Sequence, residues 1–166
     1  MGLRNVLKSN DPMLRKKCRE VTDFDARLHR LVDDMIETMR HADGAGLSAP
    51  QIGVLRRVCI VEITGDEEIA PIELINPRVV SARGRQRGAE GCLSIPNKTG
   101  LVRRPKRIVI EAQTRHGEPF TMVSDELEAR ALCHEIDHLD GILYIDLMER
   151  FLTKEEVEEL EREQEK

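Results

Sequence analysis

Aromatic residues are scarce in this chain, which has no Trp, one Tyr and three Phe among its 166 residues. Proteins that bind single-stranded nucleic acid stack the bases on such side chains. The formal net charge of −5 also provides no overall attraction to phosphate. We therefore expect no specific DNA partner.

Long apolar runs are also missing. No stretch approaches the roughly 18 residues that a bilayer span needs, so we expect no membrane association. The first twenty residues contain no extended apolar segment and no small-residue cleavage site. This argues against a secretory signal and predicts a cytoplasmic location.

Cysteines are few and widely spaced. The dense pattern of a small secreted scaffold is absent, so a disulfide framework is not expected. The residues remain as free thiols or metal ligands: Cys18, Cys59, Cys92 and Cys133.

Charge is distributed unevenly along the chain. Residues 76–107 carry nine Lys or Arg and one acid, Glu90, a local net charge of +8. Residues 150–166 carry seven Glu against four basic residues, a net charge of −3. Such segments mostly form solvated surfaces, and a basic one can also contact an anionic partner.

Two helices are predicted in the first third of the chain. Asp11 is a good N-cap for a short helix over residues 12–18, which has proline at its first position. A longer amphipathic helix follows, which Thr22 or Asp23 could cap and Gly44 could end. Its apolar positions recur at the i, i+3, i+4, i+7 spacing of a helix that buries one face: Leu28, Leu31, Val32, Met35, Ile36 and Met39.

The middle of the chain is rich in β-branched and alternating segments, which predict strands. These segments are residues 57–63, 72–77, 78–83, 106–113 and 119–124, with a hairpin turn at 115–118. The glycine-rich segment 44–53 is expected to be a loop that allows close backbone approach. A helix over 125–140, capped by Ser124 and stopped by Gly141, and a polar helix from about Thr153 complete the chain.

The order of these elements predicts the fold class. Strands cluster between helices instead of alternating with them, which favours an α+β fold with antiparallel pairing. No internal repeat or linker divides the chain. We therefore expect one domain over residues 1–166, with antiparallel strands packed around the helix at 125–140.

The sequence HEIDH lies within that helix. His134 and His138 are four residues apart, so their imidazoles project from one face about one turn apart. Leu127 and Ala131 share this face, which directs the rings toward the core, where a metal ion would satisfy them. Glu135 could then reach over an ion that both rings hold.

Two imidazoles need a further protein ligand, and no histidine follows His138. The third ligand is then a thiolate or a carboxylate. Cys92, in EGCLSIP, would bind iron or zinc and leave one tetrahedral position open. A downstream glutamate, such as Glu156 or Glu159, would instead make the site that of a zinc peptidase. A non-catalytic module with all four ligand positions closed is a third interpretation.

The chain contains, in this order, the segments GAGLSAPQ, EGCLS and HEIDHLDG. In these three ordered motifs it resembles the peptide deformylase family. NDPMLRKKC is also similar to the amino-terminal segment of that family, so the resemblance extends to about Met148. It implies a metal hydrolase that removes the formyl group from the initiator methionine of nascent polypeptides and releases formate.

The resemblance implies a role for each matched residue. Glu135 would be the general acid and base. Gln51 and the backbone N–H of Leu93 would donate to the reacting carbonyl. The implied metal is Fe²⁺, one per chain, with Zn²⁺, Ni²⁺ or Co²⁺ able to replace it. Its ligands would be Cys92, His134 and His138.

The implied substrates are N-formylmethionyl peptides. Gly46 would offer backbone hydrogen bonds to the peptide. A pocket for the methionine side chain is expected beside the metal, and three small or apolar residues are candidates for its lining: Ala45, Leu127 and Ala131.

The chain departs from the family pattern in several places. Ser48 stands where the first motif often has Ala, and Cys133 stands where Gln often precedes the histidine pair. Some members carry a basic terminal helix that is associated with ribosome docking, whereas the acidic tail of this chain would be repelled by RNA. Any ribosome contact would then fall to the basic segment at 76–107.

Two acidic residues near the motifs are expected to have supporting roles. Asp137 would pair with Arg104, because a carboxylate beside a ligand helix commonly orients the ligands. Glu90 would brace the loop that carries Cys92.

Overall fold

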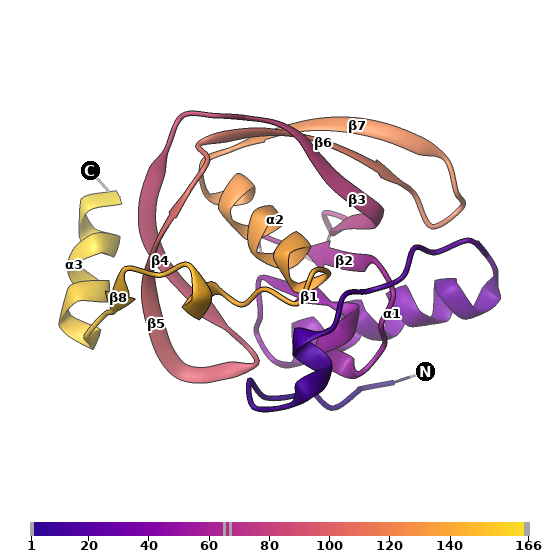
Figure 1. Ribbon diagram of the computed structural model, residues 1–166, viewed down its shortest axis with the longest axis horizontal. Helices are drawn as coiled ribbons and strands as arrows, with labels where there is room; N and C mark the ends of the chain where they lie inside the picture. The colour runs from indigo at the N-terminus through magenta and orange to yellow at the C-terminus, as the bar shows by residue number, and fades with distance from the viewer. Residues whose placement is uncertain (1, 65, 67, 165–166) are drawn as a thin grey trace.

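A five-stranded and a three-stranded antiparallel sheet lie on the two sides of helix α2 (Glu126–His138), as Figure 1 shows. The larger sheet has the order β1-β2-β3-β6-β7, and the smaller has the order β4-β5-β8. The strands are β1 (Gly46–Ser48), β2 (Val58–Val61), β3 (Ile72–Arg83), β4 (Gln86–Cys92), β5 (Ile95–Arg104), β6 (Arg107–Gln113), β7 (Pro119–Asp125) and β8 (Arg150–Phe151). This computed structural model describes residues 2–64, 66 and 68–164, and it confirms the α+β fold class.

Helix α1 (Ala26–His41) begins later than predicted. Its N-cap is Asp25, whose carboxylate accepts a hydrogen bond from the first-turn backbone, so the assignment of Thr22 or Asp23 was wrong. The helix also ends before Gly44. Its apolar face is buried, as the periodicity predicted, and packs against β1 and β2.

The segments on either side of α1 also differ from the prediction. The N-terminal helix is a 3₁₀ turn, Pro12–Arg15, and stops before residue 18, although Asp11 does cap it. Residues 44–53 are not an irregular loop: they contain β1 and a second 3₁₀ turn, Ala49–Ile52.

The strand predictions were partly confirmed. Strands β2, β6 and β7 and the hairpin turn at 115–118 lie where they were expected. The two segments 72–77 and 78–83 form one strand, β3, with irregular register against β6. Strands β4 and β5 were missed, because their glycines, arginines and polar residues interrupt the alternation that marks a strand.

Helix α2 begins with Asp125 as its N-cap, not with Ser124 as predicted. The Ser124 hydroxyl instead donates to Glu128 Oε1 at 2.6 Å. The helix ends at His138, and Gly141 provides the stop: its φ of 75° is in the left-handed region, and its amide donates to the His138 carbonyl.

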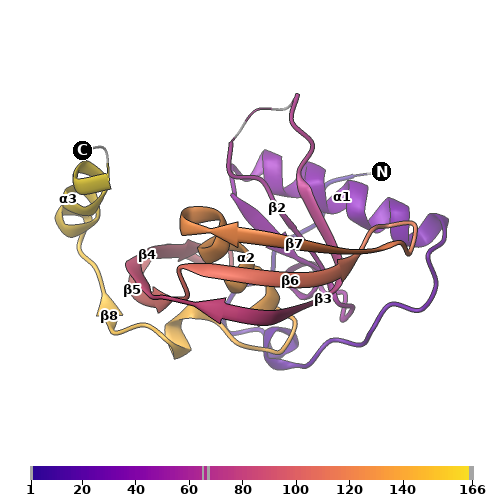
Figure 2. The same cartoon turned by 90° about the horizontal axis from the view of Figure 1, so that it is seen from above.

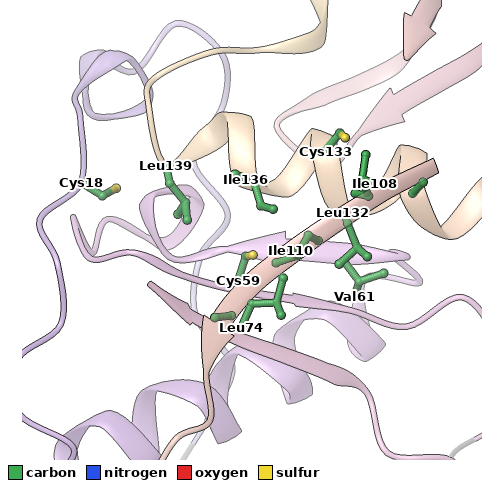
Figure 3. Close-up of a cluster of buried hydrophobic side chains, with 12 residues drawn as sticks. Cys18, Cys59, Val61, Leu74, Ile108, Ile110, Leu132, Cys133, Ile136 and Leu139 are labelled. Carbon is green, nitrogen blue, oxygen red and sulfur yellow. The ribbon is translucent and has the colours of Figure 1, made fainter. Parts of the chain in front are cut away.

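The core side of α2 packs on the larger sheet. Figure 3 shows Leu132, Ile136 and Leu139 pointing toward Cys59 and Ile110 of that sheet. This contact fixes the helix, so that its opposite side faces β4 and β5.

The polar C-terminal helix is α3 (Lys154–Gln164), close to its predicted start, and none of its residues is buried. Figure 2 shows it at one end of the molecule, next to β8 and away from α2. Among the described residues, no helix has both the length and the apolar character that a membrane span requires.

Candidate metal centre

Three potential ligands converge between β4 and α2. Cys92 ends β4, and His134 and His138 lie one turn apart on α2. One ligand atom from each lies within 4.8 Å of the others. The Cys92 Sγ atom is 3.5 Å from His138 Nε2. Within the described residues, this is the only such group of three or more Cys, His, Asp or Glu side chains.

Local backbone structure explains how Cys92 reaches the helix. The pairing of β4 with β5 shifts register between Glu90 and Cys92, and Cys92 then lies opposite Ile95 across a tight turn. A register irregularity of this kind redirects a side chain at the end of a strand. The thiol is partly exposed, unlike the three other cysteines, which are buried.

Glu90 fixes the orientation of His134. Its Oε1 atom lies 2.9 Å from His134 Nδ1, which leaves Nε2 to face Cys92 and a metal. Glu90 also receives hydrogen bonds from Arg104 (2.8 and 2.9 Å) and Arg130 (2.8 Å). Burial by itself would raise the pKa of Glu90, but Arg104 and His134 lower it to about 2.

Arg104 extends this network to a second carboxylate. Its Nη1 atom is 2.5 Å from Asp137 Oδ2, which confirms the expected pair. Burial is the largest influence on the pKa of Asp137 and raises it, although Arg104 acts in the opposite sense. The Arg104 guanidinium thus links β5 to Glu90 on β4 and to Asp137 on α2, which attaches the β4–β5 hairpin to that helix.

The pKa values of the two histidines are shifted in opposite directions. Burial, followed by the neighbouring charge of His134, holds the pKa of His138 well below its usual value, which favours the neutral ring that a metal requires. Burial would also lower the pKa of His134, but its interactions with Cys92 and Glu90 raise it well above the usual value. This ring must lose its proton to bind a cation.

Glu135 lies beside the ligand group and is buried. Its Oε1 atom is 2.9 Å from the Ser48 hydroxyl. A Cβ atom added to Gly46 would be only 2.5 Å from Glu135 Oε2, so any side chain there would displace the Glu135 carboxyl group. Burial raises the pKa of Glu135 above its ordinary value, against the opposing effects of His134 and Ser48.

Gln51 is a buried residue with a fixed orientation. Its Oε1 atom accepts a hydrogen bond from the Ser48 amide at 2.9 Å. Its Nε2 atom therefore points to the metal ligands, 3.5 Å from Cys92 Sγ and 3.1 Å from Ser94 Oγ. An N–H donor so close to the ligand group can also donate to a carbonyl oxygen that enters the site.

A cavity of about 570 Å³ opens onto these groups. It brings together Gln51, Cys92, His134 and Glu135 with every predicted substrate-contacting residue: Ala45, Gly46, Leu93, Leu127 and Ala131. Leu127 is 57% exposed and Ala45 is also exposed, so neither is a core residue. The apolar atoms at the cavity wall are available to an apolar side chain.

The donor set fits a divalent cation. A thiol and two imidazoles converge beside an open cavity, which Cys92 and His134 line, and the His134 ring is held by a carboxylate. Within the described residues, two buried polar atoms have no hydrogen-bond partner, His138 Nδ1 and Tyr144 Oη. The Tyr144 ring stacks on His134 at a centroid distance of 6.0 Å.

The sequence did not reveal all of this arrangement. The contacts of Arg130 and Tyr144 with the site were missed, because they depend on how β4, β5 and the 3₁₀ turn Tyr144–Asp146 surround α2. The Ser48 contact was also missed, and the only signal was an unusual hydroxyl in a motif of small residues.

The glutamate alternative is contradicted. Glu156 lies on α3, where its side chain pairs with Arg150 at 2.6 Å and accepts from the Thr153 amide. Glu159 lies on the same exposed helix, at a different pocket. Neither belongs to the ligand group, and the group has three members and an open side, so it is not the closed four-ligand module.

Known proteins are similar to this chain in both sequence and fold. The family model described as polypeptide deformylase matches residues 3–154. The chain is 48% identical to a peptide deformylase of Caldicellulosiruptor bescii, with 96% of this chain and 93% of the relative covered. It is 50% identical to that of Heliobacterium modesticaldum, with 90% and 96% covered.

Solved structures with a similar fold are also peptide deformylases. A peptide deformylase from Legionella pneumophila has a TM-score of 0.85 and 38% identity, covering 96% of this chain and 92% of that one. The enzyme from Thermotoga maritima has a TM-score of 0.84 and 36% identity, covering 88% and 97%. With its sequence, its fold and its Cys–His–His group in agreement, the chain belongs to the polypeptide deformylase family.

Proposed function

We propose that this chain is a peptide deformylase, a metallohydrolase that removes the formyl group from N-formylmethionyl peptides and releases formate. The observation that carries the proposal is the convergence of Cys92, His134 and His138 beside a cavity that Cys92 and His134 line together with Glu135 and Gln51. Family membership supports the same activity. The chain would act as one catalytic domain in the cytoplasm.

The three ligands would hold one divalent cation. Thiolate and imidazole donors suit both iron and zinc, and we propose Fe²⁺ as the resident metal, with Zn²⁺, Ni²⁺ and Co²⁺ as substitutes. When bound, such a cation acts as a Lewis acid, which polarises a carbonyl and makes water more acidic.

Glu135 would move the proton in the reaction. Its carboxylate accepts a proton from the attacking water and, once protonated, donates it to the departing amine. Its burial and raised pKa suit a group that must hold a proton between two steps. Formate and a free N-terminus are the products.

Gln51 and Leu93 would stabilise the charge that develops on the formyl oxygen. The Gln51 carboxamide is already oriented by Ser48, so its Nε2 donor needs no rearrangement during the reaction. Leu93 lines the same cavity, and its backbone N–H would be the second donor.

The substrate would lie along the same cavity. Gly46 would hydrogen-bond the peptide backbone, and Ala45, Leu127 and Ala131 would form part of the pocket for the methionine side chain. Their small or apolar side chains at the cavity wall support this assignment.

The test is formate release by anaerobically purified, metal-loaded protein. A formyl-methionyl tripeptide should yield formate, and the same tripeptide without the formyl group should remain intact. Cleavage of peptide bonds without formate release would favour a peptidase and would refute the proposal.

We also propose that the ribosome contacts the basic segment at 76–107. Arg83 ends β3 and Arg85 lies in the turn before β4, and both are exposed. Reversing both charges to Glu should weaken ribosome binding and reduce its salt dependence. Reversal of Lys16 and Lys17, which are exposed elsewhere, is the control. Equal binding by the two double variants would reject the contact.

A further inference from the structure

Ser48 links two functional groups of the site from a fully buried position. Its hydroxyl lies 2.7 Å from the Glu135 carbonyl oxygen and 2.9 Å from Glu135 Oε1. Its backbone amide donates to Gln51 Oε1. The last residue of β1 thus contacts both the candidate acid/base and the candidate carbonyl donor.

The hydroxyl supplies a partner that α2 itself does not. Glu135 lies in the last turn of the helix, where carbonyl groups lack intrahelical partners. The amide of Leu139, which could have reached the Glu135 carbonyl, donates to Ile136 and Asp137 instead. The Ser48 hydroxyl fills this place and is thereby fixed beside the Glu135 side chain.

Both protonation states of Glu135 can use this hydroxyl. A serine hydroxyl has one proton to donate and lone pairs that accept. It can donate to Oε1 when Glu135 is a carboxylate, and it can still do so when the proton is on Oε2, because Oε1 then remains an acceptor. In either state Glu135 Oε1 is occupied by Ser48.

The second carboxyl oxygen has different surroundings. Oε2 lies against Gly46, so closely that a Cβ atom there would be 2.5 Å away. Gly46 and Glu135 both line the cavity. The two oxygens are therefore distinguished by the protein: one is held by a hydroxyl group, and the other lies beside a residue without a side chain.

We propose that Ser48 is a positioning residue that holds Glu135 Oε1, so that Oε2 exchanges the proton with the attacking water and the departing amine. This inference rests on the proposed function and deepens it. An alanine at position 48 offers the carboxyl group no hydrogen bond, which leaves the side chain free to rotate its two oxygens.

The test compares Ser48→Ala, Ser48→Thr and a matched control, Ser124→Ala. Ser124 is also a buried serine that donates to a glutamate of α2, but at the other end of the helix. Formate release is measured with metal-loaded enzyme, kcat is normalised to bound metal, and Tm shows that each variant is folded at the assay temperature.

Ser48→Ala should lower kcat about tenfold, with KM and metal content unchanged, because one charge-assisted hydrogen bond is lost. Ser48→Thr keeps the hydroxyl and should restore most of kcat, and Ser124→Ala should leave it unchanged. The proposal is overturned if the kcat of Ser48→Ala stays within twofold of the parent value, or if its lower activity is explained by a changed KM or metal content. It is also overturned if folded Ser48→Thr has a kcat as low as that of Ser48→Ala. A parent enzyme that releases no formate would instead refute the proposed function.

Discussion

Glu90→Gln should destabilise the protein strongly, although it removes no metal ligand. The carboxylate of Glu90 is shared by Arg104, Arg130 and His134, and the two arginines and Glu90 are all about 5% exposed. A neutral amide removes this carboxylate from two buried guanidinium groups, of which Arg104 keeps its pair with Asp137. Breaking a buried ion pair by removing one partner costs roughly 3–5 kcal/mol.

The pKa of Glu90 leads to a similar magnitude. A decrease from the ordinary 4.5 to about 2 corresponds to about 3 kcal/mol of folding free energy at neutral pH. Because the folded-state pKa is the lower one, this stabilisation is complete above pH 4.5 and is lost as the pH falls toward 2. The variant lacks this titration, so the difference in stability between parent and variant should shrink over the same range.

Urea denaturation of the metal-free proteins at pH 7 measures the effect. The free energy of unfolding should fall by roughly 3–5 kcal/mol, and Tm should fall by about 2–4 °C per kcal/mol at this chain length. Glu111→Gln is the control, because it removes an exposed pair with Arg78, and such pairs contribute about 0–1 kcal/mol. A loss for Glu90→Gln no larger than that of Glu111→Gln would refute the reasoning.

Two further predictions follow from individual contacts. Gly46→Ala places a methyl group 2.5 Å from Glu135 Oε2; kcat should fall on the order of 100-fold while bound metal is retained, because small displacements of reacting groups have effects of this size. Unchanged kcat would contradict the contact. Burial raises the pKa of both Cys18 and Cys133 to about 11. Iodoacetamide at pH 8 should therefore modify the partly exposed Cys92 in metal-free protein and leave Cys18 and Cys133 unmodified. The labelling of Cys18 and Cys133 should increase as the pH is raised toward 11. Peptide mapping that finds Cys133 labelled at pH 8 would argue against its protection.

The sequence predicted the ligand-bearing helix well, because local patterns determine it. HEIDH combines an i, i+4 histidine pair with a helical segment, and nothing distant is needed to place the two rings on one face. Strands β4 and β5 were missed for the opposite reason. They are stabilised by pairing with each other and by the ion pairs of Glu90 and Arg104, which no short window of sequence displays.

The sequence named residues that the fold brings to one cavity, but it did not reveal the groups that hold them in place. Motif residues such as Cys92 and Gln51 reach the same cavity as expected. Ser48 and Tyr144 could not be assigned in advance, because a buried hydroxyl or ring acquires its role from what the fold places beside it. The N-cap of α1 was mispredicted for a related reason. Asp25 lies within three residues of Thr22 and Asp23, and Asp and Thr are both common N-cap residues, so the sequence does not show which of them begins the helix.

X-ray absorption at the zinc edge of zinc-loaded protein tests the central claim most directly, which is that the sulfur of Cys92 and the nitrogens of His134 and His138 bind one ion. The account predicts one sulfur at about 2.3 Å and two nitrogens at about 2.0–2.1 Å, with a lighter atom in the remaining position. Cys92→Ala should remove the sulfur signal. A spectrum of the parent protein that fits nitrogen and oxygen alone would contradict the account.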